Sequence, residues 1–280
     1  EVIYCLASLY SLLVTLGICT NAMIITATIM SKALHGTCNI LIAFCAFSDI
    51  LHLYGHLPKL FPIFAGQPEM SSLLCCFLQI IPNFGMSSGT ILVLLIALDR
   101  FIAVRFATFA VRTSVRRHLA AHLLSLLAYA GLQYSFVVIF FTETRVICNP
   151  PEAYHGAGKD WWALTSLIVY LSAIAVYIAV WREMRKVGTT SDARRLRRIS
   201  RAIFSITAVV TCGWLLTMTI VIGNGFLLDL KGRAMYIGNE LAGIPVNISL
   251  SVNYFVLYFT SSDYRAAFRR NLSVIPIIGR

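Results

Sequence analysis

Charged residues are scarce in this sequence. Asp, Glu, Lys and Arg together make up 12% of its 280 residues, whereas 58% of the residues are hydrophobic. The mean hydropathy is +0.78. A soluble domain carries about twice that charged fraction, and the apolar residues here come in runs of the ~20 residues that a membrane-spanning helix needs. The composition therefore excludes an ordinary soluble domain and predicts a protein that crosses a membrane several times.

Motifs of several enzyme and metal-binding classes are also missing. The sequence has no His-Glu-x-x-His and no Gly-x-Ser-x-Gly motif. None of its eight cysteines belongs to a Cys-x-x-Cys pair or to a Cys/His cluster with metal spacing, so we expect no metal site. Asp49 is placed near the middle of a predicted span and Asp99 at the end of another, so the two acids cannot form a catalytic dyad. We predict that the protein is not an enzyme.

Seven long apolar segments can be placed along the chain. In lipid they must be helices, because an open sheet would leave backbone groups without hydrogen bonds. We therefore predict an all-α membrane protein, with a seven-transmembrane helix bundle in residues 1–260. Residues 261–280 are predicted to form a short amphipathic helix on the cytoplasmic membrane surface and a tail. The predicted spans are residues 3–30, 38–58, 73–104, 117–141, 161–186, 198–226 and 234–260.

The net charge of +11 does not indicate nucleic acid as a partner, because the basic residues gather in alternate gaps between spans. Such a bias marks the cytoplasmic loops of membrane proteins. It predicts an extracellular N-terminus, a cytoplasmic C-terminus, an odd number of spans, and contact with membrane lipids. The basic residues of the poorer set of gaps are Lys59, Arg145, Lys159, Lys231 and Arg233.

The length of the third predicted span can be compared with the thickness of the membrane. Cys75 and Arg100 are 25 positions apart, which is about 37 Å along a helix and exceeds the ~30 Å hydrocarbon core. We therefore expect Cys75 at the outer face and Arg100 at the cytoplasmic end. A disulfide from Cys75 to Cys148 would pin the loop between the fourth and fifth spans over the mouth of the bundle. Cys76 is a competing partner, and free thiols are the remaining alternative.

Asp49 is the one acid placed well inside an apolar span. Burying a lone carboxylate is costly, so Asp49 should face the bundle interior with partners or water. The site is either a structural polar cluster or an ion- or proton-sensitive site coupled to helix movement, with a sodium ion as the candidate cation. Candidate partners are Asn21, Ser87, Ser88, Thr90, Asn247 and Asn253.

Several of these features together resemble the rhodopsin-like (class A type) G-protein-coupled receptors. They are the seven spans, Asn21, Asp49, the pair of Cys75 and Cys148, and the triplet Asp99-Arg100-Phe101, which is similar to the Asp-Arg-Tyr signature. Within that class the chain is most similar to the nematode serpentine chemoreceptors of the srsx class, over nearly its whole length. The passages that carry this resemblance are TCNILIAFCAFSDILHLYGH (37–56), LIALDRFIAV (95–104), CGWLLT (212–217) and NYFVLYFTSSDYRAAF (253–268).

The resemblance implies a plasma-membrane receptor that binds a small extracellular molecule and activates a heterotrimeric G protein. In such receptors the arginine matching Arg100 is held by the neighbouring acid at rest, which makes Asp99, Arg100 and Phe101 the coupling switch. Many family members add an acid at the base of the sixth helix, but residues 194–201 contain none. A peptide receptor of the same fold is an alternative. A transporter using Asp49 would need internal repeats that the sequence does not have.

Further absences narrow the mechanism and the ligand. No proline follows Trp214 in the sixth span, and the seventh span lacks the proline usual after Asn253. Pro82 should bend the third helix, and it stands where amine receptors carry an acid. The seventh span has no lysine for retinal, so we expect no cofactor. The candidate ligand contacts are Gln79, Asn83, His52, Tyr170 and Trp214, with His56, Trp161, Trp162, Asn224 and Glu240 as further groups. Each alone is more often a packing or interfacial residue, and Trp161 and Trp162 in particular fit an interfacial aromatic belt.

Overall fold

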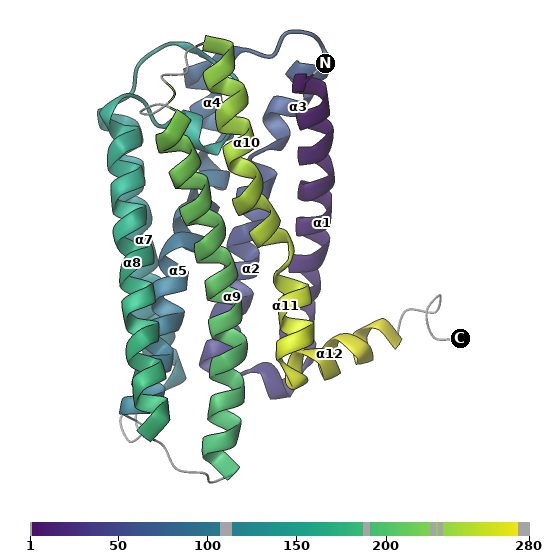
Figure 1. The fold of residues 1–280 in the computed structure, drawn as a ribbon, viewed down its shortest axis with the longest axis vertical. Coiled ribbons are helices and arrows are strands. Elements are labelled where there is room, and N and C mark those ends of the chain that lie inside the picture. The colour runs from purple at the N-terminus through teal and green to yellow at the C-terminus, as the bar shows by residue number, and fades with distance from the viewer. Residues whose placement is uncertain (1, 107–113, 187–190, 225–227, 229–231, 274–280) are drawn as a thin grey trace.

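A computed structural model describes residues 2–106, 114–186, 191–224, 228 and 232–273, with the side chains of 191–199, 233, 272 and 273 left out of the description. Within these residues seven helical segments are long and apolar enough to span a membrane, as predicted. They run side by side along the long axis of the molecule (Figure 1). The seven segments are Val2–Met30, Thr37–Phe64, Ile80–Arg105, Val115–Ile139, Ala157–Lys186, Ser200–Ile222 and Ala234–Thr260.

The two ends of the bundle differ. The N-terminus and the short antiparallel strands β1 (Met70–Ser71) and β2 (Arg145–Val146) mark one end, which we call the disulfide end. Helix α5 (Ile80–Arg105) ends and α9 (Ser191–Ile222) begins at the opposite end, which we call the Asp99 end. There α12 (Ser262–Ser273) lies across the base of α1 (Val2–Met30) instead of continuing the bundle (Figure 1).

The third span is not the continuous helix over 73–104 that hydropathy predicted. It consists of α4 (Ser72–Leu78) and α5, separated at Gln79. Pro82 has no N–H, so the carbonyl of Leu78 loses its partner four residues on and the helix breaks just before the proline. The helix is thus broken where a bend was expected from Pro82. Cys75 and Arg100 belong to different helices, so their separation is not that of one continuous helix.

The second span also breaks, and it extends beyond the predicted end at residue 58. Helix α2 (Thr37–Tyr54) stops at Gly55, and α3 (Leu57–Phe64) continues it. Pro58 likewise has no N–H to donate to the carbonyl of Tyr54, so α2 ends before it. Pro58 lies in the first turn of α3, where a proline is tolerated. Lys59, which was assigned to a loop, is instead a buried helical residue.

The remaining helices differ from the predicted spans mainly at their ends, because caps and charged turns lie outside the apolar runs. The Oγ of Ser114 accepts a hydrogen bond from the N–H of Arg117 and starts α7 (Val115–Ile139) two residues early. Helix α8 (Ala157–Lys186) begins four residues early, and α9 begins within the basic segment and ends at Ile222. The seventh span divides at Val252 into α10 (Gly232–Ser251) and α11 (Asn253–Thr260). Residues 225–226 and 274–280 lie outside the described residues.

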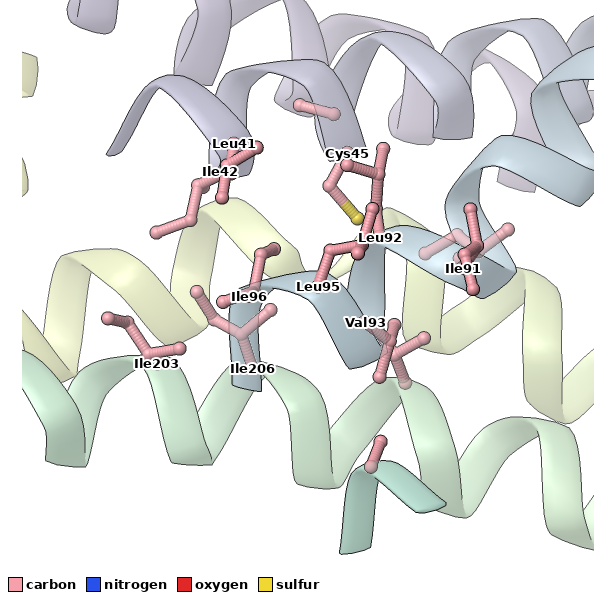
Figure 2. Close-up of a cluster of buried hydrophobic side chains, with 14 of the residues drawn as sticks. Leu41, Ile42, Cys45, Ile91, Leu92, Val93, Leu95, Ile96, Ile203 and Ile206 are labelled. Carbon is pink, nitrogen blue, oxygen red and sulfur yellow. The ribbon is translucent and has the colours of Figure 1, made fainter. Parts of the chain in front are cut away.

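The centre of the bundle is an apolar layer contributed mainly by α2, α5 and α9 (Figure 2). Gly85 of α5 allows α2 to approach closely, since a Cβ there would lie 2.5 Å from Leu51 Cβ and 2.6 Å from the carbonyl oxygen of Ser48. This contact fixes the helix that carries Asp49 against the helix that carries Asp99. The labelled side chains of the layer are Leu41, Ile42, Cys45, Ile91, Leu92, Val93, Leu95, Ile96, Ile203 and Ile206.

Helix α12 confirms the predicted amphipathic C-terminal helix. Ser261 Oγ accepts a hydrogen bond from the N–H of Tyr264 at its start. Tyr264 and Phe268 are buried, and the Tyr264 hydroxyl lies 3.2 Å from Thr28 Oγ1 of α1. Arg269 remains exposed on the other face. The apolar face of α12 is therefore docked on the bundle.

Candidate functional site

A disulfide joins Cys75 of α4 to Cys148 in the loop after β2, with the Cα atoms 5.4 Å apart. This settles the choice that the sequence left open. The neighbouring Cys76 stays free, with its Sγ 3.6 Å from the carbonyl oxygen of Ala153. The bridge and the β1–β2 pairing hold the loop between α7 and α8 over the bundle.

That loop fills the interior beneath it with an aromatic side chain. Tyr154 is buried and stacks on Trp162 of α8, with ring centroids 5.5 Å apart. Trp162 in turn meets the edge of Trp214 of α9 at 6.2 Å. Trp162 is only 6% exposed, so its assignment to an interfacial belt is wrong, whereas Trp161 is 48% exposed and fits one.

Three of the five predicted ligand contacts meet at Trp214. His52 of α2 stacks on its ring at 5.7 Å and Tyr170 of α8 at 5.8 Å. All three side chains are buried. We call Tyr154, Trp162, His52, Tyr170 and Trp214 the aromatic cluster. It links the loop, α2, α8 and α9 across the bundle, so a ligand that displaces one ring must move a neighbour.

The other two predicted contacts do not join the aromatic cluster. The Nε2 of Gln79 donates to the carbonyl of Gly55 at 2.7 Å and lies 3.5 Å from Cys148 Sγ. Gln79 therefore ties the break in the second span to the break in the third and to the disulfide. Asn83 lines a separate cavity of about 530 Å³ that also includes Phe77 and Val138, both largely exposed. Gln79 contacts the helix breaks, and Asn83 is a buried residue on the wall of this separate cavity.

A buried ion pair lies at the disulfide end. Lys59 Nζ of α3 is 2.5 Å from Glu240 Oε2 of α10, and both side chains are at most 3% exposed. Asn149 Nδ2 donates to the other carboxylate oxygen at 2.9 Å, and the ring of Tyr10 lies under the ammonium at 3.8 Å. Sequence reasoning selected Glu240 but missed Lys59, because a lysine just after Pro58 looks like the end of a span.

Glu240 also lines a cavity of about 790 Å³ at this end, larger than the cavity beside Asn83, and we call it the vestibule. Its wall carries acidic and basic side chains. The acids are Glu69, Glu152 and Glu240, and the bases are Arg145 and Lys159. A polar or zwitterionic molecule would find complementary groups in it.

Asp49 is buried and has one of its predicted partners. Asn253 Nδ2 donates to Asp49 Oδ2 at 2.9 Å. Asn21 instead donates to the carbonyl of Leu250 at 3.0 Å, and Asn247 to that of Gly243 at 2.8 Å. Among the described residues, Ser88 Oγ has no hydrogen-bond partner.

The oxygens around Asp49 suit a hard cation by their chemistry. Asn253 Oδ1 and Ser88 Oγ are buried and have no partner among the described groups. A Cβ added at Gly89, the neighbour of Ser88, would lie 3.6 Å from Asp49 Oδ1, so this part of α5 lies close to the carboxylate. Carboxylate, amide and hydroxyl oxygens are the ligands that such ions take. A small cavity of about 20 Å³, lined in part by Asn21 and Asn253, has room for one water molecule.

Asp99 and Arg100 form a largely buried ion pair at the opposite end, with side chains 6% and 12% exposed. Arg100 donates to Asp99 Oδ2 from Nε at 2.9 Å and from Nη2 at 2.5 Å. The other oxygen, Oδ1, lies 3.1 Å from His118 Nε2 of α7. The ring of Phe101 packs edge-on against that of Phe106, with the centroids 6.2 Å apart. The base of α9 that would carry a second acid, residues 194–199, has no described side chains.

A seven-helix bundle with a disulfide-pinned loop at one end and a buried Asp-Arg pair at the other defines the class of G-protein-coupled receptors. The model of the serpentine type 7TM GPCR chemoreceptor Srsx family matches residues 14–272, and the chain belongs to this family. It is also similar to the C-C chemokine receptor type 1 of Macaca fascicularis, with 24% identity over 283 residues that cover 95% of this chain and 78% of the relative. The chain is thus a multi-pass membrane protein, and the proteins it resembles are receptors.

Proposed function

We propose that this chain is a chemosensory receptor of the plasma membrane that binds a small extracellular molecule at the disulfide end. It then activates a heterotrimeric G protein at the Asp99 end. The placement of basic residues supports this orientation, since Arg105, Arg116, Arg117, Arg185 and Lys186 all lie at the ends of helices there. The N-terminus is then extracellular and α12 lies on the cytoplasmic side.

The observation that carries this proposal is the hold of Asp99 on Arg100. Two hydrogen bonds from a guanidinium to one carboxylate oxygen restrain a side chain that is always charged and long enough to swing to another partner. Ligand binding shifts the population toward the arrangement that releases Arg100, provided that the ligand binds that arrangement more tightly. The aromatic cluster supports a route for this coupling, because Trp214 and Tyr170 belong to α9 and α8.

A sodium ion near Asp49 is part of the same proposal. Asp49, Ser88 and Asn253 would supply its protein oxygens. The ion would neutralise the carboxylate and hold α2, α5 and α11 in the resting arrangement.

A peptide ligand is the second candidate. The vestibule of about 790 Å³ supports it, because helices α1 and α10 and the loops around β1 and β2 all contribute to its wall, which carries acidic and basic side chains. The similarity to a receptor named for chemokines supports it as well. Trp214→Leu should abolish the response to a small molecule that enters the aromatic cluster. Glu152→Gln should weaken a peptide that stays in the vestibule and leave that small molecule unaffected.

Ligand-free signalling of Asp99→Asn tests the switch. The substitution removes the charge that holds Arg100, and each 1.4 kcal/mol lost from the resting state is about a tenfold change in the equilibrium. We therefore expect a several-fold rise in basal second-messenger production at matched surface expression. Arg100→Ala should remove ligand-stimulated signalling.

Asp160→Asn is the matched control, since Asp160 is an exposed acid in the first turn of α8 at the disulfide end. It should signal like the wild type. Unchanged basal signalling in Asp99→Asn, or normal stimulation in Arg100→Ala, would count against the proposed switch.

A further inference from the structure

Asp99 has a second set of neighbours that the receptor switch does not use. His118 and His122 lie one turn apart on α7, and their rings meet edge-on with centroids 4.5 Å apart. One ligand atom each of Asp99, His118 and His122 can be chosen so that all three lie within 4.8 Å of one another. The sequence did not suggest this cluster because its acid comes from another helix.

One nitrogen of His122 is buried in this cluster without a hydrogen-bond partner in the described part of the chain. That nitrogen is Nε2, and the residue is 8% exposed. A buried polar atom without a partner costs free energy. His118 Nε2 and Asp99 Oδ1 lie 3.1 Å apart beside it. An ion between the three groups would satisfy the lone pair of His122.

The ligand types and their arrangement match a transition metal more than a hard cation. Two imidazoles and a carboxylate suit zinc, and three protein ligands leave the fourth tetrahedral position for water. Metal–ligand bonds of about 2.0–2.2 Å place tetrahedral ligands roughly 3.4 Å apart. The ligand atoms lie within 4.8 Å of one another, so the widest pair must close by at most about 1.4 Å, which rotation about the side-chain torsions has to supply. The i, i+4 spacing already puts both histidines on one face of the helix.

Arg100 does not occupy the oxygen that faces the histidines. Both of its bonds to Asp99 go to Oδ2, whereas Oδ1 is the oxygen beside His118. A metal can therefore bind Oδ1 without displacing the guanidinium. The two cations share one carboxylate charge, so we expect an affinity below that of a structural zinc site.

We propose that Asp99, His118 and His122 form a binding site for a divalent transition-metal ion of the zinc type at the Asp99 end of the bundle. The site joins α5 to α7. It does not depend on signalling, so metal binding and the proposed receptor function can fail separately.

Binding of Zn²⁺ to the purified full-length chain in detergent micelles tests the proposal. The midpoint of thermal unfolding should rise with Zn²⁺ concentration and stay unchanged with Mg²⁺, which takes oxygen ligands. His122→Gln should weaken Zn²⁺ binding by at least about tenfold, since even the loss of outer-shell partners of metal sites costs ~10–100-fold. The substitution breaks no hydrogen bond of Nε2, so the fold should persist.

His35→Gln is the matched control, because His35 is an exposed histidine whose Nε2 contacts the carbonyl of Ile29. It should bind Zn²⁺ like the wild type. Co²⁺ absorption of the wild type gives a readout that needs no variant. Bands of imidazole and carboxylate ligation are expected, whereas thiolate bands would place the metal on free cysteines. Thiolate ligation, or wild-type affinity in His122→Gln, would overturn the proposal.

Discussion

At the scale of single residues, Glu240 is held by groups from three distant parts of the chain. Lys59 comes from α3, Asn149 from the disulfide-pinned loop, and the Tyr10 hydroxyl of α1 donates to the carbonyl of Glu240 at 2.8 Å. Burying two charges is costly, and the attraction between them compensates only when the geometry is good and the remaining atoms are hydrogen-bonded. These contacts meet that condition, so the pair should be sensitive to loss of either partner.

Lys59→Met should destabilise the protein strongly. It leaves the carboxylate of Glu240 buried without its cation, although Asn149 and Tyr236 still contact it. Breaking a buried pair in this way costs about 3–5 kcal/mol. The midpoint of thermal unfolding in detergent should fall accordingly. The double variant Lys59→Met/Glu240→Gln removes both charges and should recover most of the loss.

Arg145→Gln provides the control at the same end of the bundle. Arg145 and Glu69 are 3.7 Å apart, but their side chains are 71% and 57% exposed. Exposed pairs contribute about 0–1 kcal/mol, so little change is expected. If Lys59→Met is no more destabilising than Arg145→Gln, the buried pair does not stabilise the fold.

At the scale of helices and strands, two prolines act by the same mechanism. Each break falls three residues before a proline, at Gly55 before Pro58 and at Gln79 before Pro82. The missing N–H explains both breaks, although Pro245 lies inside the continuous helix α10. The sequence could not predict that Gly55 and Gln79 would bond to each other, because that depends on the packing of α2 against α5.

Gly85→Ala tests that packing. The new Cβ would meet backbone atoms of α2, at 2.6 Å from the carbonyl oxygen of Ser48 and 2.8 Å from the amide nitrogen of His52, so the helices must separate. Overpacking of this kind costs about 1–3 kcal/mol, and we expect a lower midpoint of thermal unfolding.

Gly131→Ala is the matched substitution. Gly131 is a helical glycine of α7 with no atom within 4 Å of its Cβ position. Alanine there should stabilise the helix by roughly 0.5–1 kcal/mol. The two variants should therefore move the unfolding midpoint in opposite directions, and equal shifts would contradict the close contact at Gly85.

At the scale of the whole molecule, the sequence predicted the helices but not the contacts between segments that are far apart in the chain. Apolar runs predicted the spans, and the amphipathic spacing of Tyr264 and Phe268 predicted α12. The partners Lys59 of Glu240 and His118 of Asp99, and the insertion of Tyr154 beside Trp162, were not predictable. Each joins segments far apart in the chain, and single-sequence reasoning has no signal for such contacts.

The disulfide is the bond that ties the loop at one end to the bundle as a whole. Cys148→Ser should release the loop that carries Tyr154 and thereby loosen the aromatic cluster. Loss of a native disulfide costs about 2–5 kcal/mol, so we expect a lower midpoint of thermal unfolding and reduced surface expression. Cys75→Ser should have the same effect, because the two substitutions break the same bond.

Cys76→Ser distinguishes the two adjacent thiols. Burial raises the pKa of the Cys76 thiol, and Glu143 adds to the rise. Since the thiolate is the species that exchanges with disulfides, Cys76 should remain reduced beside the bridge. Its substitution should change the unfolding midpoint little, and alkylation of the denatured, unreduced chain should show one thiol fewer than in the wild type. If Cys76→Ser lowers the midpoint as much as Cys148→Ser while Cys75→Ser leaves it unchanged, then Cys76, and not its neighbour, anchors the loop.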